Sequence, residues 1–257
     1  MKSKSALLFA AVLVFGAASV DGQMRTYDGY NLPHGWMPPV HDSTINYLVL
    51  FEKFEFRTGQ AEDAVVVDAQ GWIGGDFHRF WWKAEGEEER RSPKTGEFEV
   101  QALYGRMIHA FWDVQAGLRF DRRYSGSERD TRTHFALGLQ GTAPYWFEVE
   151  PTLFVSDEGD VTFEFEASFE QLIAQRLVIE PRIDVAAAFQ DDRRHAVGSG
   201  FNEVELGLRL RYEFSRQFAP YVGVTWTRAL GETAGLRRQA GERVSESAVV
   251  FGLRAWF

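Results

Sequence analysis

Residues 161–170 read VTFEFEASFE, in which apolar and polar or acidic residues alternate for ten positions. Successive side chains of a β-strand point to opposite faces, so Phe163 and Phe165 would share an apolar face, and Glu164 and Glu166 would share an acidic one. In a soluble sheet the apolar face would pack in a protein core. In a transmembrane barrel it would face lipid, and the acids would line a wet interior.

The same alternation recurs along the chain after residue 45, and no helical period competes with it. Two clear examples are YWFEVEPTLFV, at 145–155, and VELGLRLRYEF, at 204–214. The pattern predicts an all-β fold with strands at 46–57, 64–73, 77–86, 97–106, 110–122, 131–141, 145–155, 161–171, 176–189, 203–214, 218–228 and 247–257.

The connections between these strands alternate in length. Tight turns are predicted at 74–76, 107–109, 142–144, 172–175 and 215–217, and longer charged loops at 58–63, 86–96, 124–130, 156–160, 190–200 and 229–246. Short periplasmic turns, longer extracellular loops and an even number of strands are typical of bacterial outer-membrane barrels. We therefore expect 46–257 to form a transmembrane antiparallel outer-membrane β-barrel of about 12 strands, with both termini in the periplasm. A soluble β-sandwich is the alternative.

The first residues predict an exported protein. Lys2 and Lys4 precede the apolar stretch ALLFAAVLVFGAASV, which is followed by small residues and is short for a membrane-spanning helix. Residues 1–22 are thus predicted to be a signal peptide, and 23–45 a short periplasmic segment. The expected location is the outer membrane of a Gram-negative bacterium.

Charge and composition exclude some partners. The formal net charge is -9, which argues against nucleic acid and is compatible with a cation as partner. There is no cysteine, so neither a disulfide nor a thiolate metal site is available. A metal ion would have to use histidine, methionine or carboxylate ligands.

Several strings in the chain carry a resemblance to a known family. They are VDAQGWIGGDFHRFWWKAEGE, FWDVQAGLRFD, APYWFEVEPTLFVSDEG, QRLVIEPRIDV, GSGFNEVELGLRLRYEFSRQFAPYVGVTWTR and FGLRAWF. Together they resemble the copper resistance protein B family over roughly residues 35–257. The resemblance implies an outer-membrane barrel associated with copper, and a periplasmic multicopper oxidase as partner. The Met, His and Asp repeats that many members carry before the barrel are largely missing here.

Candidate copper ligands lie at one end of the predicted barrel. His34, Met37 and His41 offer thioether and imidazole donors, which suit copper in either oxidation state. If this segment folds back, Met107, His109 and His78 at the same end could complete a site. The alternatives are a linker or plug for the segment, and separate surface residues for the other three.

The inward face of the strands predicts a charged lumen. Its acids are Asp68, Asp113, Glu148, Glu150, Glu164, Glu166, Glu180, Asp184 and Glu205, and its cations are Arg79, Lys83, Arg119, Arg182, Arg209 and Arg211. Mixed charges inside a small barrel favour an ion-pair network, and an excess of acids favours cation entry. His134 is predicted to face inward, and His195 to lie exposed in an extracellular loop.

No catalytic arrangement stands out, so we do not expect an enzyme. His41, Asp42 and Ser43 are neighbours, but adjacent residues of an extended chain point to opposite sides. The expected function is copper tolerance, by binding copper ions or letting them cross the outer membrane. The expected partners are copper ions, outer-membrane lipid and the multicopper oxidase. The alternative is a cation-leaning porin or a structural barrel without a specific metal function.

Overall fold

The computed structural model describes residues 44–60, 63–90, 95–193 and 195–257. The predicted signal peptide and the candidate ligands His34, Met37 and His41 lie outside the described residues. The strands are β1 (Asn46–Gly59), β2 (Ala64–Gly74), β3 (His78–Glu89), β4 (Thr95–His109), β5 (Trp112–Ser125), β6 (Glu128–Ala143), β7 (Phe147–Ser156), β8 (Val161–Phe169), β9 (Gln171–Ala174), β10 (Leu177–Ala188), β11 (Gly200–Tyr212), β12 (Phe218–Ala229) and β13 (Ser245–Trp256).

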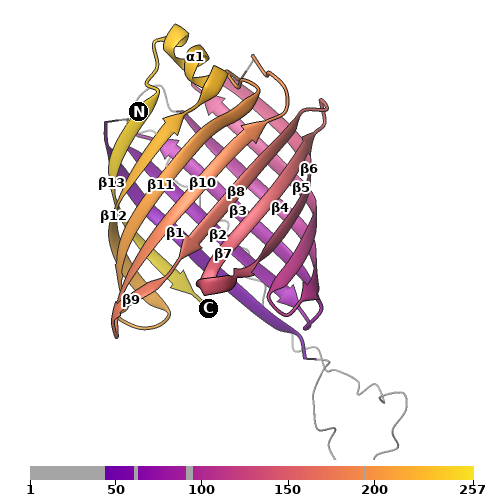
Figure 1. Ribbon diagram of the computed structural model, residues 1–257, viewed down its shortest axis with the longest axis vertical. Helices are drawn as coiled ribbons and strands as arrows, with labels where there is room; N and C mark the ends of the chain where they lie inside the picture. Colours follow the sequence, from indigo (N-terminus) through magenta and orange to yellow (C-terminus); the bar gives the residue numbers. More distant parts are fainter. Residues whose placement is uncertain (1–43, 61–62, 91–94, 194) are drawn as a thin grey trace, which may run out of the picture. The chain divides into compact units, whose positions relative to one another are not determined.

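The strands form one antiparallel sheet that closes on itself (Figure 1). Apart from β8 and β9, neighbours along the chain pair with each other, and β13 pairs with β1 through Leu50 opposite Trp256. The short β9 pairs with the beginning of β10, so β8 and β9 are two parts of one wall strand interrupted at Glu170. The prediction of a 12-stranded antiparallel barrel is confirmed, with β9 as an extra segment.

The two faces of the wall have opposite character. Large apolar side chains are exposed on the outside, among them Phe80, Leu118 and Phe251. Charged side chains are buried inside, and Arg211 and Glu55 are each only 1% exposed. A soluble protein has the reverse arrangement, because apolar burial is what stabilises its core. The outer face of this barrel therefore suits lipid, and the soluble sandwich is excluded.

Several predicted boundaries are wrong, in most cases because the strands run further than the alternation indicates. Met107 and His109 belong to β4, and the turn itself is at 110–111. The predicted loop at 124–130 is a two-residue turn in which Gly126 has a φ of 61°, a conformation that glycine adopts without strain. The predicted turn at 172–175 lies mostly in β9. Tyr145 and Trp146 form a 3-10 turn, so β7 begins at Phe147.

One helix was not predicted. α1 (Gly231–Ala240) lies within the long connection between β12 and β13, and Gly241 ends it with a φ of 77°. The backbone N–H of Gly241 donates to the carbonyls of Arg237 and Arg238, a common helix C-cap. Thr233 and Ala234 are its buried residues. Among the described residues, no helix has both the length and the apolarity needed to cross a membrane.

Candidate functional site

The barrel has two distinct ends. We call the end where β1 begins and β13 finishes the terminal end, and the end that carries α1 and the longer connections the loop end. His78, Met107 and His109 lie at the terminal end, as the strand order predicts. Their sides differ. His78 stacks on Tyr104 with ring centroids 5.9 Å apart, and Tyr104 and Met107 point to opposite faces of β4.

The structure therefore separates His78 from Met107 by the thickness of the wall. In the part of the chain that is described, no three His, Asp or Glu side chains converge in the geometry of a metal site. The role of His34, Met37, His41, Met107, His109 and His78 as copper ligands stays a prediction.

The predicted lumen acids are mostly engaged in ion pairs. Their partners are Lys53 for Asp68, Arg79 for Asp113, Lys83 for Glu150, Arg119 for Glu164, Arg182 for Glu166 and Asp184, Arg211 for Glu180, and Arg57 for Glu205. Glu148 is exposed. It is the second residue of β7 and lies near the terminal end. A role for these acids in cation passage stays a prediction.

Three buried arginines on β10 and β11 form what we call the arginine wall: Arg182, Arg209 and Arg211. Arg209 donates to Glu55 from Nε at 3.2 Å and from Nη2 at 3.1 Å, and the Tyr221 hydroxyl donates to the same carboxylate at 3.0 Å. Arg211 lies 2.6 Å from Glu180 and 2.9 Å from Glu170. These charge-assisted contacts compensate the charges that burial removes from water.

Arg182 extends this network across the lumen. It pairs with Glu166 and Asp184, and its guanidinium also lies 3.7 Å from Glu52 on β1 and 3.9 Å from Asp68 on β2. Since β11, β12, β13 and β1 separate β10 from β2 along the wall, the contact with Asp68 spans the interior. Lys83 on β3 and Glu150 on β7 make a second bridge of this kind. Charged side chains thus cross the lumen.

A β-bulge in β1 adds two charges to the interior. Phe51 pairs with Ala69 and Lys53 pairs with Asp68, so Glu52 is the extra residue. Both charges make contacts inside: Lys53 lies 3.0 Å from Asp68, and Gln70 donates to Glu52 at 3.4 Å. Sequence reasoning missed these residues because strict alternation sends adjacent side chains to opposite faces. The signal was the pair of adjacent charges in FEKFEF.

The opposite side of the interior carries what we call the acid wall: Glu85 and Glu87 on β3, and Glu97 and Glu99 on β4. Glu99 is paired with Arg119 at 2.7 Å, Glu97 with Arg123 at 3.1 Å, and Glu87 with Arg57 at 3.8 Å. Glu85 has an exposed side chain, and no cationic side chain of a described residue lies within ion-pair distance of it. Sequence reasoning missed Glu85, although it shares the strand phase of Arg79 and Lys83.

The acid wall borders a polar cavity of about 260 Å³. Its charged lining comprises the acids Asp68, Glu85, Glu87, Glu97, Glu99, Asp121 and Glu164, and the cations Lys53, Arg119, Arg122 and Arg123. Seven carboxylates therefore face four basic side chains. Confined charge of one sign concentrates counter-ions, so this cavity favours cations.

A second cluster lies at the loop end, where the connection between β10 and β11 meets β6. His195 is 2.7 Å from Asp192 through Nδ1 and 2.6 Å from Asp130 through Nε2. Arg132 pairs with Asp192, Asp160 and Glu158. The side chain of His195 is only 11% exposed, so the prediction of an exposed His195 is wrong. His134 is buried and faces inward, with Nδ1 3.4 Å from Asp121.

His195 lies between two carboxyl groups, with one ring nitrogen within hydrogen-bond distance of each. Burial raises the pKa of Asp192, but its hydrogen bond with His195 and the charges of His195 and Arg132 hold that pKa below the usual value. These contacts tie the β10–β11 connection to β6 and to the β7–β8 connection.

Comparison with known proteins gives the family. A family model described as copper resistance protein B precursor matches residues 45–257. A copper resistance protein B homolog of Pseudomonas syringae pv. tomato is 41% identical over 218 residues, which cover 85% of this chain and 72% of that protein. Copper resistance protein B of Escherichia coli is 39% identical over 218 residues, with the same coverage of 85% and 72%.

Solved structures support the fold alone. The KdgM porin matches with a TM-score of 0.50 and 10% identity, covering 82% of this chain and 99% of the porin. The NanC porin matches with a TM-score of 0.50 and 16% identity over the same shares of 82% and 99%. Barrel and family together indicate an outer-membrane location and support a role in copper resistance. The chain belongs to the copper resistance protein B family.

Proposed function

We propose that this protein contributes to copper resistance by drawing copper ions into the acid-lined cavity of its barrel and binding them with ligands of the N-terminal segment. The observation that carries the proposal is the surplus of carboxylates around the cavity, above all Glu85, which projects into it without a cationic partner among the described residues. A divalent cation would relieve the repulsion among these carboxylates.

The barrel interior is better suited to attracting cations than to passing them freely. The bridges from Arg182 to Asp68 and from Lys83 to Glu150 cross the lumen. A hydrated ion would have to displace these pairs, and breaking a buried ion pair costs about 3–5 kcal/mol. The bridged lumen favours slow transfer over open conduction.

The coordinating groups are assigned to the N-terminal segment. His34, Met37 and His41 combine thioether and imidazole donors, and Met107 and His109 at the terminal end could add to them. In this proposal, residues 1–22 are a signal peptide and the terminal end faces the periplasm. A periplasmic multicopper oxidase would then be the partner that receives copper.

The test is copper retention by the detergent-folded protein after exposure to copper(II) chloride and dialysis, measured by elemental analysis. The chain with residues 23–44 is compared with the chain that lacks them. We expect about one copper per chain with the segment and a loss of most of it without the segment, as removal of a ligand set requires. Equal retention by the two forms would contradict the assigned ligands, and absence of copper from both would contradict copper binding altogether.

A cation-leaning pore is the second candidate, and the same carboxylate surplus favours it. Planar bilayer recordings under a salt gradient separate the two. Steady conductance with a cation-selective reversal potential would support the pore. Absence of conductance, together with copper retention, would support binding.

A further inference from the structure

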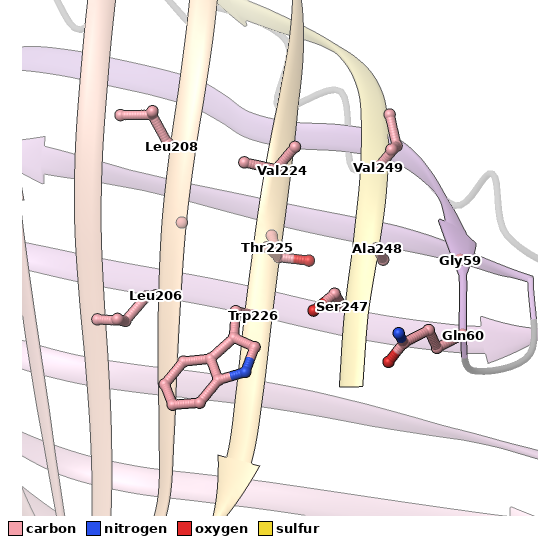
Figure 2. Close-up of a pocket in the computed structure, with 11 residues that line it drawn as sticks. Gly59, Gln60, Leu206, Leu208, Val224, Thr225, Trp226, Ser247, Ala248 and Val249 are labelled. Carbon is pink, nitrogen blue, oxygen red and sulfur yellow. The ribbon is translucent and has the colours of Figure 1, made fainter. Parts of the chain in front are cut away.

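A groove lies on the outer, lipid-facing wall of the barrel, over β11, β12 and β13. It has a volume of about 460 Å³, which is within the range of roughly 300–1,000 Å³ for small-ligand sites. Figure 2 shows Leu206 and Leu208 on one side, Val224 and Trp226 in the middle, and Ser247 and Val249 on the other side.

The strand register explains why this surface is hollow. Leu206, Trp226 and Ser247 form one cross-strand row, and Leu208, Val224 and Val249 form the next. Each row begins with a leucine on β11 and ends with a smaller side chain, Ser247 or Val249, on β13. At the loop end of the groove, β1 finishes at Gly59, which adds no side chain. The result is an apolar lane along β13, bordered by Trp226.

Two arginines lie at the loop end of this lane. Arg228 is two residues beyond Trp226 on the same outward face of β12, and it is exposed. Arg243 is also exposed, and its guanidinium donates to the carbonyl of Gln60, which lines the groove. Among the described residues, no carboxylate forms an ion pair with either arginine. The lane is therefore apolar along its length and cationic at its mouth.

We propose that this groove binds a phosphate-bearing membrane lipid, with an acyl chain in the lane and the phosphate on Arg228 and Arg243. An apolar chain gains from filling a preformed apolar groove, and a guanidinium forms two parallel hydrogen bonds with phosphate oxygens. The proposal goes beyond the role in copper resistance and does not depend on it. A lipid held here would also brace the ends of β12 and β13 next to α1.

Native mass spectrometry of the detergent-folded full chain tests the proposal. The probes are bisphosphorylated lipid A, phosphatidylglycerol and an uncharged diacylglycerol, each added at equal concentration. We expect one lipid per barrel for the phosphorylated probes and at least fivefold lower occupancy for diacylglycerol. The comparison of lipid A with phosphatidylglycerol identifies which phosphorylated lipid binds better. Equal occupancy for all three probes would overturn the role of the phosphate.

Matched variants test the two parts of the site separately. Arg228→Gln with Arg243→Gln should lower occupancy by phosphorylated lipid about tenfold, since two charge-assisted contacts are lost. The control Arg129→Gln changes an outward, exposed arginine at the loop end of β6 and should have no effect. Val249→Phe should fill the lane and lower occupancy, whereas Val222→Phe, outward on β12 but outside the groove, should not. Unchanged lipid occupancy in the arginine pair or in Val249→Phe would overturn the proposal.

Discussion

The arginine wall and the acid wall face the same lumen but differ in how their charges are compensated. On the arginine wall, Arg209 and Arg211 are 4% and 1% exposed, and each contacts a carboxylate within 3.2 Å. On the acid wall, pairing weakens from Glu99 to Glu87 and is not found for Glu85 among the described residues. The charges of the arginine wall are matched by nearby carboxylates, whereas the four carboxylates of the acid wall have three cationic partners among the described residues.

Arg182→Met should give the largest effect, because it removes the cation shared by carboxylates on four strands. We expect the free energy of unfolding to fall by about 3 kcal/mol or more, as expected when one partner of a buried pair is removed. Urea unfolding in detergent, followed by tryptophan fluorescence, measures it. A decrease in the free energy of unfolding below about 1 kcal/mol would mean that water in the lumen screens the ion pairs of Arg182 too strongly for them to stabilise the barrel.

Glu85→Gln combined with Glu87→Gln should change function more than stability. The pair removes two charges from the cavity and relieves repulsion with neighbouring acids, so the free energy of unfolding should stay within about 1 kcal/mol of the parent. Copper(II) retention or cation conductance should fall severalfold. Glu128→Gln combined with Glu242→Gln, which removes two exposed carboxylates, is the matched control. Equal loss in the control would attribute the effect to net charge alone.

His195→Ala should loosen the β10–β11 connection without unfolding the barrel. Loss of hydrogen bonds to two carboxylates removes about 1.5–3 kcal/mol each at most, and less where Asp130 is exposed. We expect trypsin to cleave after Arg193 about tenfold faster than in the parent. An unchanged rate would show that Arg132 alone holds this connection.

The same connection should depend on pH. The pKa of Asp192 is lower in the folded protein than in the unfolded chain, so its contribution is fully present above the unfolded value of about 4. It is lost as pH falls through the lower, folded value. Amide hydrogen exchange at 190–199, corrected for intrinsic rates, should be slow at pH 6 and accelerate below about pH 4. Asp192→Asn should weaken this acid-dependent step, and the remainder would come from Asp191, which accepts a hydrogen bond from the backbone N–H of Ser199.

Arg123→Met should have the smallest effect. Arg123 and Glu97 lie at the rim of the acid wall with side chains 54% and 59% exposed, and exposed pairs contribute about 0.2–1 kcal/mol. The unfolding measurement used for Arg182→Met gives the comparison directly. A loss similar to that of Arg182→Met would erase the distinction between the two walls.

The sequence by itself determined most of the strands, their order and, outside the bulge in β1, the face to which each side chain points. These are local properties, because a period of two places every second residue on one face wherever the strand lies. Glu164 and Glu166 illustrate this, since both make ion pairs inside the barrel. The lengths of the connections predicted that short turns lie at one end of the barrel and long loops at the other. The strands extend further than the apolar alternation indicates.

The tertiary structure decided which inward charges meet. Arg182 reaches Glu52 and Asp68 only because the sheet closes and brings β10 opposite β1 and β2. The bulge that turns both Glu52 and Lys53 inward breaks the period on which the sequence argument relies. The burial of His195 likewise depends on Asp130, 65 residues away on another strand. Such contacts depend on closure and stagger of the barrel, which no local pattern encodes.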